Sequence, residues 1–188
     1  NMAGKTVLLK TIGLTQTLCQ FGFFVPAKEA EISLVDDILF SIGDQQSESN
    51  GLSSFAVEIL NINKIIKEVK EGQQVLALVD ELARTTNPEE GKALVSGFVN
   101  LMCKYNIDAL ITTHYSGLSC NCRRLRVKGL KIKNNEQNIT AENINQYMDY
   151  SLTETNNEEV PMEALAIAEI FGIDSDLIEQ AKKILFYF

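Results

Sequence analysis

Long apolar runs are missing from this sequence of 188 residues. None reaches the ~20 consecutive apolar residues that a transmembrane helix needs, so we expect no membrane partner. Nothing in the sequence resembles a secretory signal, and we therefore expect a cytoplasmic protein. The hydrophobic content of 45% is that of an ordinary globular domain with a full core.

Basic residues are few compared with acidic ones. The sequence has 17 Lys and Arg against 25 Asp and Glu, which gives a formal net charge of −8. Binding to a nucleic-acid backbone depends on Lys and Arg side chains that displace counterions. If the protein binds nucleic acid, we therefore expect other domains to make most of that contact.

Residues that bind transition metals are also scarce. The only histidine is His114, and there are four cysteines. Cys19 and Cys103 lie in apolar helical patterns, which predicts buried thiols, while Cys120 and Cys122 form a single C-x-C pair. A zinc site needs more ligands at matched spacing. We expect reduced thiols and no metal bound by cysteine.

Apolar segments of helical and strand type alternate along the first two thirds of the chain, which favours an α/β fold with a mainly parallel sheet and helices on both faces. The predicted helices cover residues 5–21, 54–70 and 90–105, and the predicted strands lie around 32–34, 38–40, 75–79 and 109–113.

The character of the sequence changes after His114. Residues 123–133 are rich in Arg and Lys with alternating apolar positions, and residues 147–152 are suited to pair with them. We favour an antiparallel strand pair at the sheet edge with a solvated basic face, over a phosphate-binding patch. The acidic net charge of the chain makes the second interpretation weaker.

Two short helices are predicted at the end of the chain, over 162–171 and from about 175 to 188. Gly172 supplies the stop between them, and Asp174 or Ser175 caps the second helix. Their apolar positions exceed what a small hairpin buries by itself, so we expect docking on the core or on a second subunit. We therefore divide the chain into an α/β core, 1–155, and a C-terminal helix pair, 156–188.

The most informative segment is the first one. Its residues match the second half of the phosphate-loop pattern G-x-x-x-x-G-K-[ST]: Asn1-Met2-Ala3-Gly4-Lys5-Thr6. Lys5 is placed to reach the β- and γ-phosphates of a nucleotide, and the Thr6 hydroxyl is a candidate Mg²⁺ ligand. The alternative is a surface Gly-Lys turn. Since the first glycine of the pattern would precede Asn1, we expect the chain to be the C-terminal piece of a longer protein.

Two acidic residues follow a wholly apolar predicted strand. Asp80 and Glu81 end the run 75–79, and ligands of open α/β sheets bind at the carboxyl ends of the strands. Asp80 is the candidate Mg²⁺-associated carboxylate, and Glu81 is placed to orient or deprotonate the attacking water. His114 ends the next strand and is a candidate to contact the γ-phosphate or that water. The alternatives are solvated acids and a structural histidine.

Ser53 and Ser54 precede the amphipathic helix that begins near Phe55. Serine is a good N-cap, so capping alone would explain it. The second interpretation is an anion site at the helix N-terminus, directed at the γ-phosphate of a neighbouring subunit.

Five ordered segments together resemble the ATPase domain of the MutS family, an ABC-type P-loop ATPase. They are NMAGKT, similar to G-P-N-M-G-G-K-[ST]; FVPA; GLSSFAVE, similar to G-x-S-T-F-x-x-E; LVDEL; and TTHY. The resemblance implies ATP and Mg²⁺ as ligands and a homodimer formed through the ATPase face and the C-terminal helices. It implies that Ser53 contacts nucleotide in trans, and that upstream domains bind DNA for mismatch repair.

The resemblance has departures in the loop after Glu81. The family usually continues L/I-G-x-G-T, whereas this chain has Leu82-Ala83-Arg84-Thr85-Thr86, and Ala3 replaces another loop glycine. The segments IGDQQS and NPEEG are more similar to a paralogue branch not devoted to mismatch repair. Two alternatives to a DNA-directed ATPase therefore stay open: an ATPase that remodels a protein client, and a nucleotide-gated dimerisation module with negligible hydrolysis.

Overall fold

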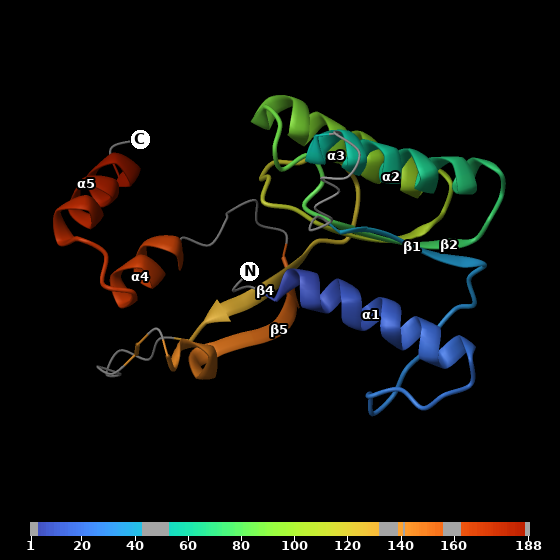
Figure 1. The fold of residues 1–188 in the computed structure, drawn as a ribbon, viewed down its shortest axis with the longest axis horizontal. Helices are drawn as coiled ribbons and strands as arrows, with labels where there is room; N and C mark the ends of the chain where they lie inside the picture. The colour runs from blue at the N-terminus through green and yellow to red at the C-terminus, as the bar shows by residue number, and fades with distance from the viewer. Residues whose placement is uncertain (1–3, 43–52, 132–138, 141, 156–162, 187–188) are drawn as a thin grey trace. The chain divides into compact units, whose positions relative to one another are not determined.

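The computed structural model describes residues 4–42, 53–131, 139–140, 142–155 and 163–186 (Figure 1). The chain divides into two compact units, Asn1–Arg123 and Arg124–Phe188. The predicted boundary after residue 155 stays a prediction.

A parallel sheet forms the centre of the first unit, with strand order β1-β2-β3. The strands are β1 (Asp37–Ile42), β2 (Val75–Asp80) and β3 (Asp108–Thr112). Ile42 pairs with Asp80, and Asp80 pairs with Thr112, so the three carboxyl ends meet at one edge. The predicted parallel α/β core is therefore present.

Helices cover both faces of this sheet (Figure 1). Helix α1 (Lys5–Gln20) lies on one face, and α2 (Ser54–Lys70) and α3 (Pro88–Lys104) lie on the other. Successive side chains of a strand point to opposite faces of the sheet, so both helix layers contact apolar side chains of the strands. Leu39, Ala77 and Val79 are in the core under α2 and α3, together with Ile65 and Val95. Phe40 of β1 and Leu78 of β2 lie on the opposite face, against Gly13 of α1.

Gly13 sets how closely α1 approaches the sheet. A Cβ atom at this position would lie 2.4 Å from the Phe40 ring and 2.9 Å from a Leu78 methyl group. Only a residue without a side chain permits this approach, which explains a glycine in the middle of a helix despite its cost in chain entropy.

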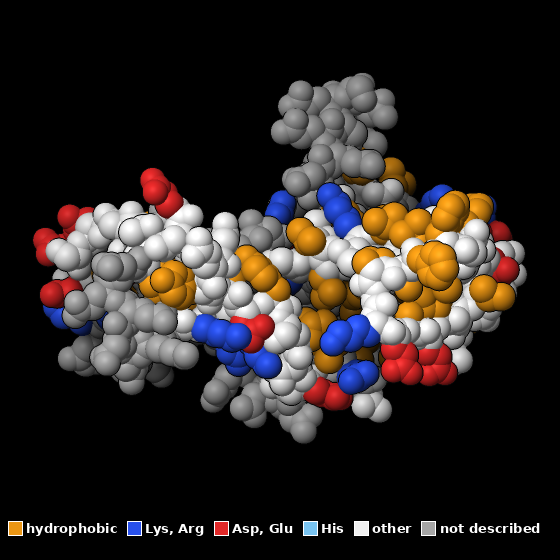
Figure 2. Space-filling model, turned by 90° about the horizontal axis from the view of Figure 1, so that it is seen from below, with side chains coloured by type: hydrophobic (Ala, Val, Ile, Leu, Met, Phe, Trp, Pro, Cys, Tyr) orange, Lys and Arg blue, Asp and Glu red, His pale blue; other side chains and the backbone are white. Residues whose placement is uncertain are grey.

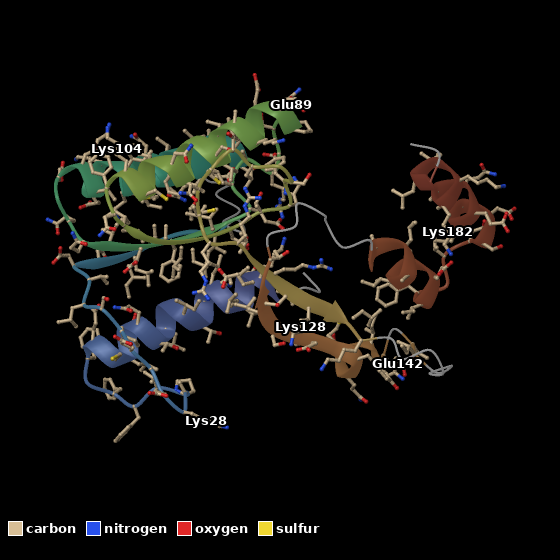
Figure 3. The ribbon with its side chains drawn as sticks, turned by 180° about the vertical axis from the view of Figure 1, so that it is seen from behind. Lys28, Glu89, Lys104, Lys128, Glu142 and Lys182 are labelled. Atoms are coloured by element: carbon tan, nitrogen blue, oxygen red, sulfur yellow. The ribbon has the colours of Figure 1, made fainter. Side chains whose placement is uncertain are left out.

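Helix α3 has a capping residue at its start and favourable charges at both ends. The Asn87 side chain accepts a hydrogen bond from the Glu89 N–H at 2.9 Å, and Pro88 occupies the first turn. Figure 3 shows Glu89 and Lys104 at opposite ends of the helix, the order of charges that the helix dipole favours.

One prediction for the start of the chain is wrong. Residues 32–34 do not form a strand, because side chains of α1 form hydrogen bonds with the backbone of this segment and of the adjoining Val35. Gln16 donates to the Ser33 carbonyl at 2.7 Å, and Gln20 bonds to both backbone groups of Val35. Helix α1 is also less deeply packed than its apolar sequence suggests. Its buried residues are Leu9, Gly13 and Gln16, since only one side faces the sheet.

Apolar side chains are consequently exposed over α1 and the segment that follows it. Figure 2 shows them gathered on this side of the first unit. The exposed residues include Val7, Leu14, Phe21, Phe23 and Phe24.

The second unit contains the predicted antiparallel pair, with β4 (Leu125–Leu130) bonded to β5 (Met148–Glu154) after the short helix η2 (Ile144–Tyr147). The pairing is as predicted, but the pair forms a two-stranded sheet of its own instead of an edge of the parallel sheet. Asp149 on β5 forms ion pairs with Lys131 at 3.0 Å and Lys128 at 4.0 Å. Part of the basic face is therefore neutralised within the hairpin.

The helix pair at the end of the described chain is also present, as α4 (Glu163–Ile170) and α5 (Ser175–Phe186). Gly172 has φ 73°, the left-handed conformation of a glycine stop, and the Asp174 carboxylate accepts the N–H groups of Asp176 and Leu177. Lys182 bonds to Glu169 across the pair. Among the described helices, none is long and apolar enough to cross a membrane.

Candidate nucleotide-binding site

The site lies at the carboxyl edge of the parallel sheet, where the first helix begins. Gly4 precedes α1 with φ 67°, a conformation that glycine adopts without strain, and its carbonyl accepts the Leu8 N–H at 2.9 Å. The first turn of α1 carries no acidic residue. Such a helix start suits an anion, because its N–H groups and the helix dipole both favour negative charge.

Two contacts join the start of α1 to the end of β2. The Lys5 ammonium lies 2.7 Å from a Glu81 carboxylate oxygen, and the Thr6 hydroxyl donates a hydrogen bond to Asp80. The side chains of Lys5 and Glu81 are 24% and 18% exposed, so the ion pair is partly shielded from water. The fold thus brings together four predicted residues, and each contact joins two of them that are more than 70 positions apart in the sequence.

Thr112 completes the polar contacts of Asp80. Its hydroxyl donates to the second carboxylate oxygen, while the Glu81 N–H reaches the Thr112 carbonyl and hydroxyl oxygens, both at 3.1 Å. Asp80 is therefore a buried carboxylate held by two hydroxyl groups. Sequence reasoning did not single out Thr112; the available signal was a hydroxyl residue at the end of an otherwise apolar strand.

The oxygen atoms at this edge fit a magnesium ion. Carboxylate and hydroxyl oxygens are hard ligands, and Mg²⁺ in nucleotide sites takes one or two protein ligands and completes its shell with phosphates and water. Asp80 and Thr6 provide this set. The described residues contain no cluster of three or more His, Cys, Asp or Glu side chains suited to hold a metal by themselves.

The loop after β2 has an unusual backbone. Glu81 has φ 52° and Ala83 has φ 62°, both in the left-handed region that side chains with a Cβ disfavour. The Glu58 carboxylate accepts the Ala83 N–H at 3.0 Å, and the Tyr115 hydroxyl donates to the Ala83 carbonyl at 2.6 Å. Burial raises the pKa of Glu58, an effect that the Ala83 N–H and the Arg84 charge partly oppose. Sequence reasoning assigned no role to Glu58 or Tyr115.

The other predicted site residues have different surroundings. His114 follows β3 and is exposed, with its ring 4.2 Å from that of Tyr115. Ser53 caps α2 by accepting the Ala56 N–H at 3.2 Å, which is the structural alternative for this serine. A contact of Ser53 with a second subunit stays a prediction. Asn1, Met2 and Ala3 lie outside the described residues.

The cysteines differ from the expected pattern in part. Cys19 and Cys103 are exposed rather than buried. The sulfur atoms of Cys120 and Cys122 lie 3.6 Å apart, and all four cysteines are thiols.

Comparison with known proteins gives one family. The family model described as MutS domain V matches residues 1–188. Curated relatives named "Endonuclease MutS2" include proteins of Caldanaerobacter subterraneus, 32% identical over 97% of this chain and 22% of that protein, and of Finegoldia magna, 33% identical over 98% and 22%. A relative of the same name in Shouchella clausii is 44% identical over 63% of this chain and 15% of its own length.

The chain spans about a fifth of the length of the curated relatives that match nearly all of it. The family match covers the phosphate-loop residues, both carboxylates at the end of β2, and the helix pair. The chain belongs to the MutS domain V family and is a MutS-like ATPase domain.

Proposed function

We propose that this domain binds ATP with Mg²⁺ and hydrolyses it. The observation that carries the proposal is the meeting of Lys5 and Thr6 with Asp80 and Glu81 at the carboxyl edge of the sheet. A lysine, a hydroxyl and two carboxylates in this order are the parts that phosphoryl transfer to water requires in P-loop ATPases.

Each residue has a role that follows from its position. Phosphate oxygens compete with Glu81 for the Lys5 ammonium, so nucleotide binding releases the Glu81 carboxylate to orient and deprotonate a water molecule. Thr6 and Asp80 hold the magnesium ion. Bound there, Mg²⁺ neutralises charge on the phosphates. His114, exposed at the same edge, contacts the γ-phosphate or the attacking water.

The whole protein is proposed to act as a homodimer on DNA in the cytoplasm. Ser53 of one copy completes the nucleotide site of the other, and the C-terminal helices and the ATPase face form the dimer contacts. The name "Endonuclease MutS2" of the relatives supports DNA as the object of the activity, and it agrees with a paralogue branch of the family. Domains outside this chain would contact the DNA, since the chain itself is acidic.

A protein client is the second candidate. It is favoured by the loop from Ala83 to Pro88, which departs from the glycine-rich family pattern, and by the net charge of −8. The two candidates differ in a simple measurement on the full-length protein. A change in the ATPase rate on addition of DNA supports the DNA-directed ATPase. An ATPase rate that stays the same with matched and mismatched duplexes at every salt concentration supports the protein client.

The substitution Glu81→Gln tests the hydrolytic assignment. It keeps the shape of the side chain and removes its basicity, so ATP should still bind while hydrolysis falls by roughly 10²–10⁴-fold. Binding is measured with a fluorescent ATP analogue, and turnover by phosphate release.

The control is Glu71→Gln, an exposed residue at the far end of α2, which should leave both quantities unchanged. Normal turnover in Glu81→Gln would show that another group activates the water. A wild-type protein that binds no ATP would contradict the proposed function itself.

A further inference from the structure

Ala83 is held in a conformation that its own side chain disfavours. It is fully buried and has φ 62°. A residue with a Cβ pays free energy to enter this region and stays there only when its surroundings stabilise the conformation. The departure from glycine at this position therefore requires compensating contacts.

Side chains from two other segments provide those contacts. The N–H of Ala83 bonds to Glu58, which lies 25 positions earlier in α2, and its carbonyl accepts the Tyr115 hydroxyl from beyond β3. The same carbonyl also receives the Thr86 N–H at 3.3 Å. Both backbone groups of Ala83 are thus fixed from outside the loop.

The burial of Glu58 supports a specific role. Burial raises the pKa of this carboxyl, and the favourable contacts that oppose the effect are the Ala83 N–H and the charge of Arg84. Arg84 in turn lies 3.6 Å from the second carboxylate oxygen of Glu81. A partly buried carboxylate of helix α2 therefore acts on the two residues that follow Leu82, beside the proposed catalytic residue.

The surface of α3 is shaped for Tyr115. A Cβ atom at Gly91 would lie 2.1 Å from the Tyr115 hydroxyl oxygen and 2.6 Å from the adjoining ring carbon. Glycine at this position lets the phenol reach Ala83. Helix α2 and the segment after β3 thus both bond to Ala83, and Gly91 of α3 leaves room for the second of these contacts.

We propose that Glu58 and Tyr115 are positioning residues, which hold Glu81 in its active orientation by fixing the backbone at Ala83. Glu81 is two residues away and itself left-handed, and the Arg84 N–H bonds to its carbonyl at 3.2 Å. The inference rests on the proposed ATP hydrolysis. It also ties Glu81 to the helix whose N-cap is Ser53, so a nucleotide that moves α2 would act on Glu81.

The experiment is a double-mutant cycle between Glu58 and Ala83 in the full-length protein. Glu58→Ala should lower kcat about 10–100-fold with little change in ATP affinity, because the loop loses its anchor while the phosphate-binding residues stay in place. Glycine adopts the left-handed conformation without help. The effect of Glu58→Ala should therefore shrink to a few-fold in the Ala83→Gly background. Glu58→Gln keeps an acceptor oxygen and should lose less activity than Glu58→Ala.

Hydrogen exchange provides a readout independent of turnover. In the protein without nucleotide, Glu58→Ala should speed amide exchange in a peptide covering residues 81–86, and Tyr115→Phe should do the same by releasing the Ala83 carbonyl. An equal loss of kcat in both backgrounds, or unchanged exchange, would overturn the positioning role. An inactive wild-type protein would overturn the proposed hydrolysis, whereas an active one with normal turnover in Glu58→Ala would overturn only this inference.

Discussion

Two glycines of α3 lie in different surroundings and offer a matched pair. Gly91→Ala places a methyl group against the Tyr115 phenol, while a Cβ at Gly97 meets no atom within 4 Å. The tyrosine must move away and give up its bond to Ala83, so Gly91→Ala should lower the free energy of unfolding by about 1–2 kcal/mol. Gly97→Ala should raise it by about 0.5–1 kcal/mol, because alanine favours the helix.

Urea unfolding of both variants checks this prediction. Equal stabilisation by the two substitutions would mean that Tyr115 does not pack against Gly91 in solution. Hydrogen exchange gives a second test of Gly91→Ala. Displacement of Tyr115 should also speed amide hydrogen exchange at residues 81–86.

The residues of a short motif were predictable, and their supporting residues were not. Lys5, Thr6, Asp80 and Glu81 follow patterns in which adjacent sequence positions define the chemistry. Glu58 and Tyr115 reach Ala83 from 25 and 32 positions away, so their role depends on how helices pack on the sheet. The same holds for Thr112, whose contact with Asp80 follows from the parallel strand register.

At the scale of elements, the hairpin of β4 and β5 contains the clearest electrostatic effect. The side chain and N–H of Ser151 bond to Asp149, and together with Lys131 they hold the pKa of this carboxyl well below its usual range. Because the folded pKa is lowered, the ionised form stabilises the hairpin above the ordinary carboxyl pKa, and the benefit disappears as the pH falls through the folded pKa.

Asp149→Asn should therefore destabilise the protein at neutral pH and cost progressively less in acid. The carboxyl pKa itself is measured by NMR titration, and it should rise in Ser151→Ala, which removes the largest cause of the shift. A stability difference between wild type and Asp149→Asn that is the same at pH 3 and pH 7 would contradict this account.

Helices and strands were predictable where periodicity and end signals agree. Helix α2 begins and ends as its apolar spacing and the Ser53 cap predict, and the parallel strands follow from their apolar runs. Residues 32–34 have strand composition, yet Gln16 and Gln20 of α1 bond to the backbone of this segment. Local sequence contains no information on such a competitor, and it does not decide which sheet the β4–β5 pair joins.

At the scale of the whole molecule, the proposed dimer makes a prediction that separates the two interpretations of Ser53. Ser53→Asp keeps an N-cap acceptor, so α2 should remain intact, but it brings negative charge toward a partner's phosphates. We expect normal thermal stability and an ATPase rate reduced by about 10-fold or more, as for loss of one electrostatic contact in a phosphate site. Normal activity would leave capping as the role of Ser53.

Mixing two inactive variants tests sharing of sites directly. A dimer of one Glu81→Gln copy and one Ser53→Asp copy contains one site with both residues intact. Random exchange of subunits should therefore restore about a quarter of the wild-type rate. A mixture as inactive as its components would show that each copy works with its own Ser53.

The ion pair of Lys5 and Glu81 has a consequence for the protein between catalytic cycles. While the Lys5 ammonium bonds to it, the Glu81 carboxylate is kept from the role of orienting water that we propose for it. In the proposed mechanism, Glu81 is therefore free to act only while phosphates occupy the lysine. Arrival of the nucleotide and release of the carboxylate would then be one event, which would protect the empty domain from unproductive chemistry.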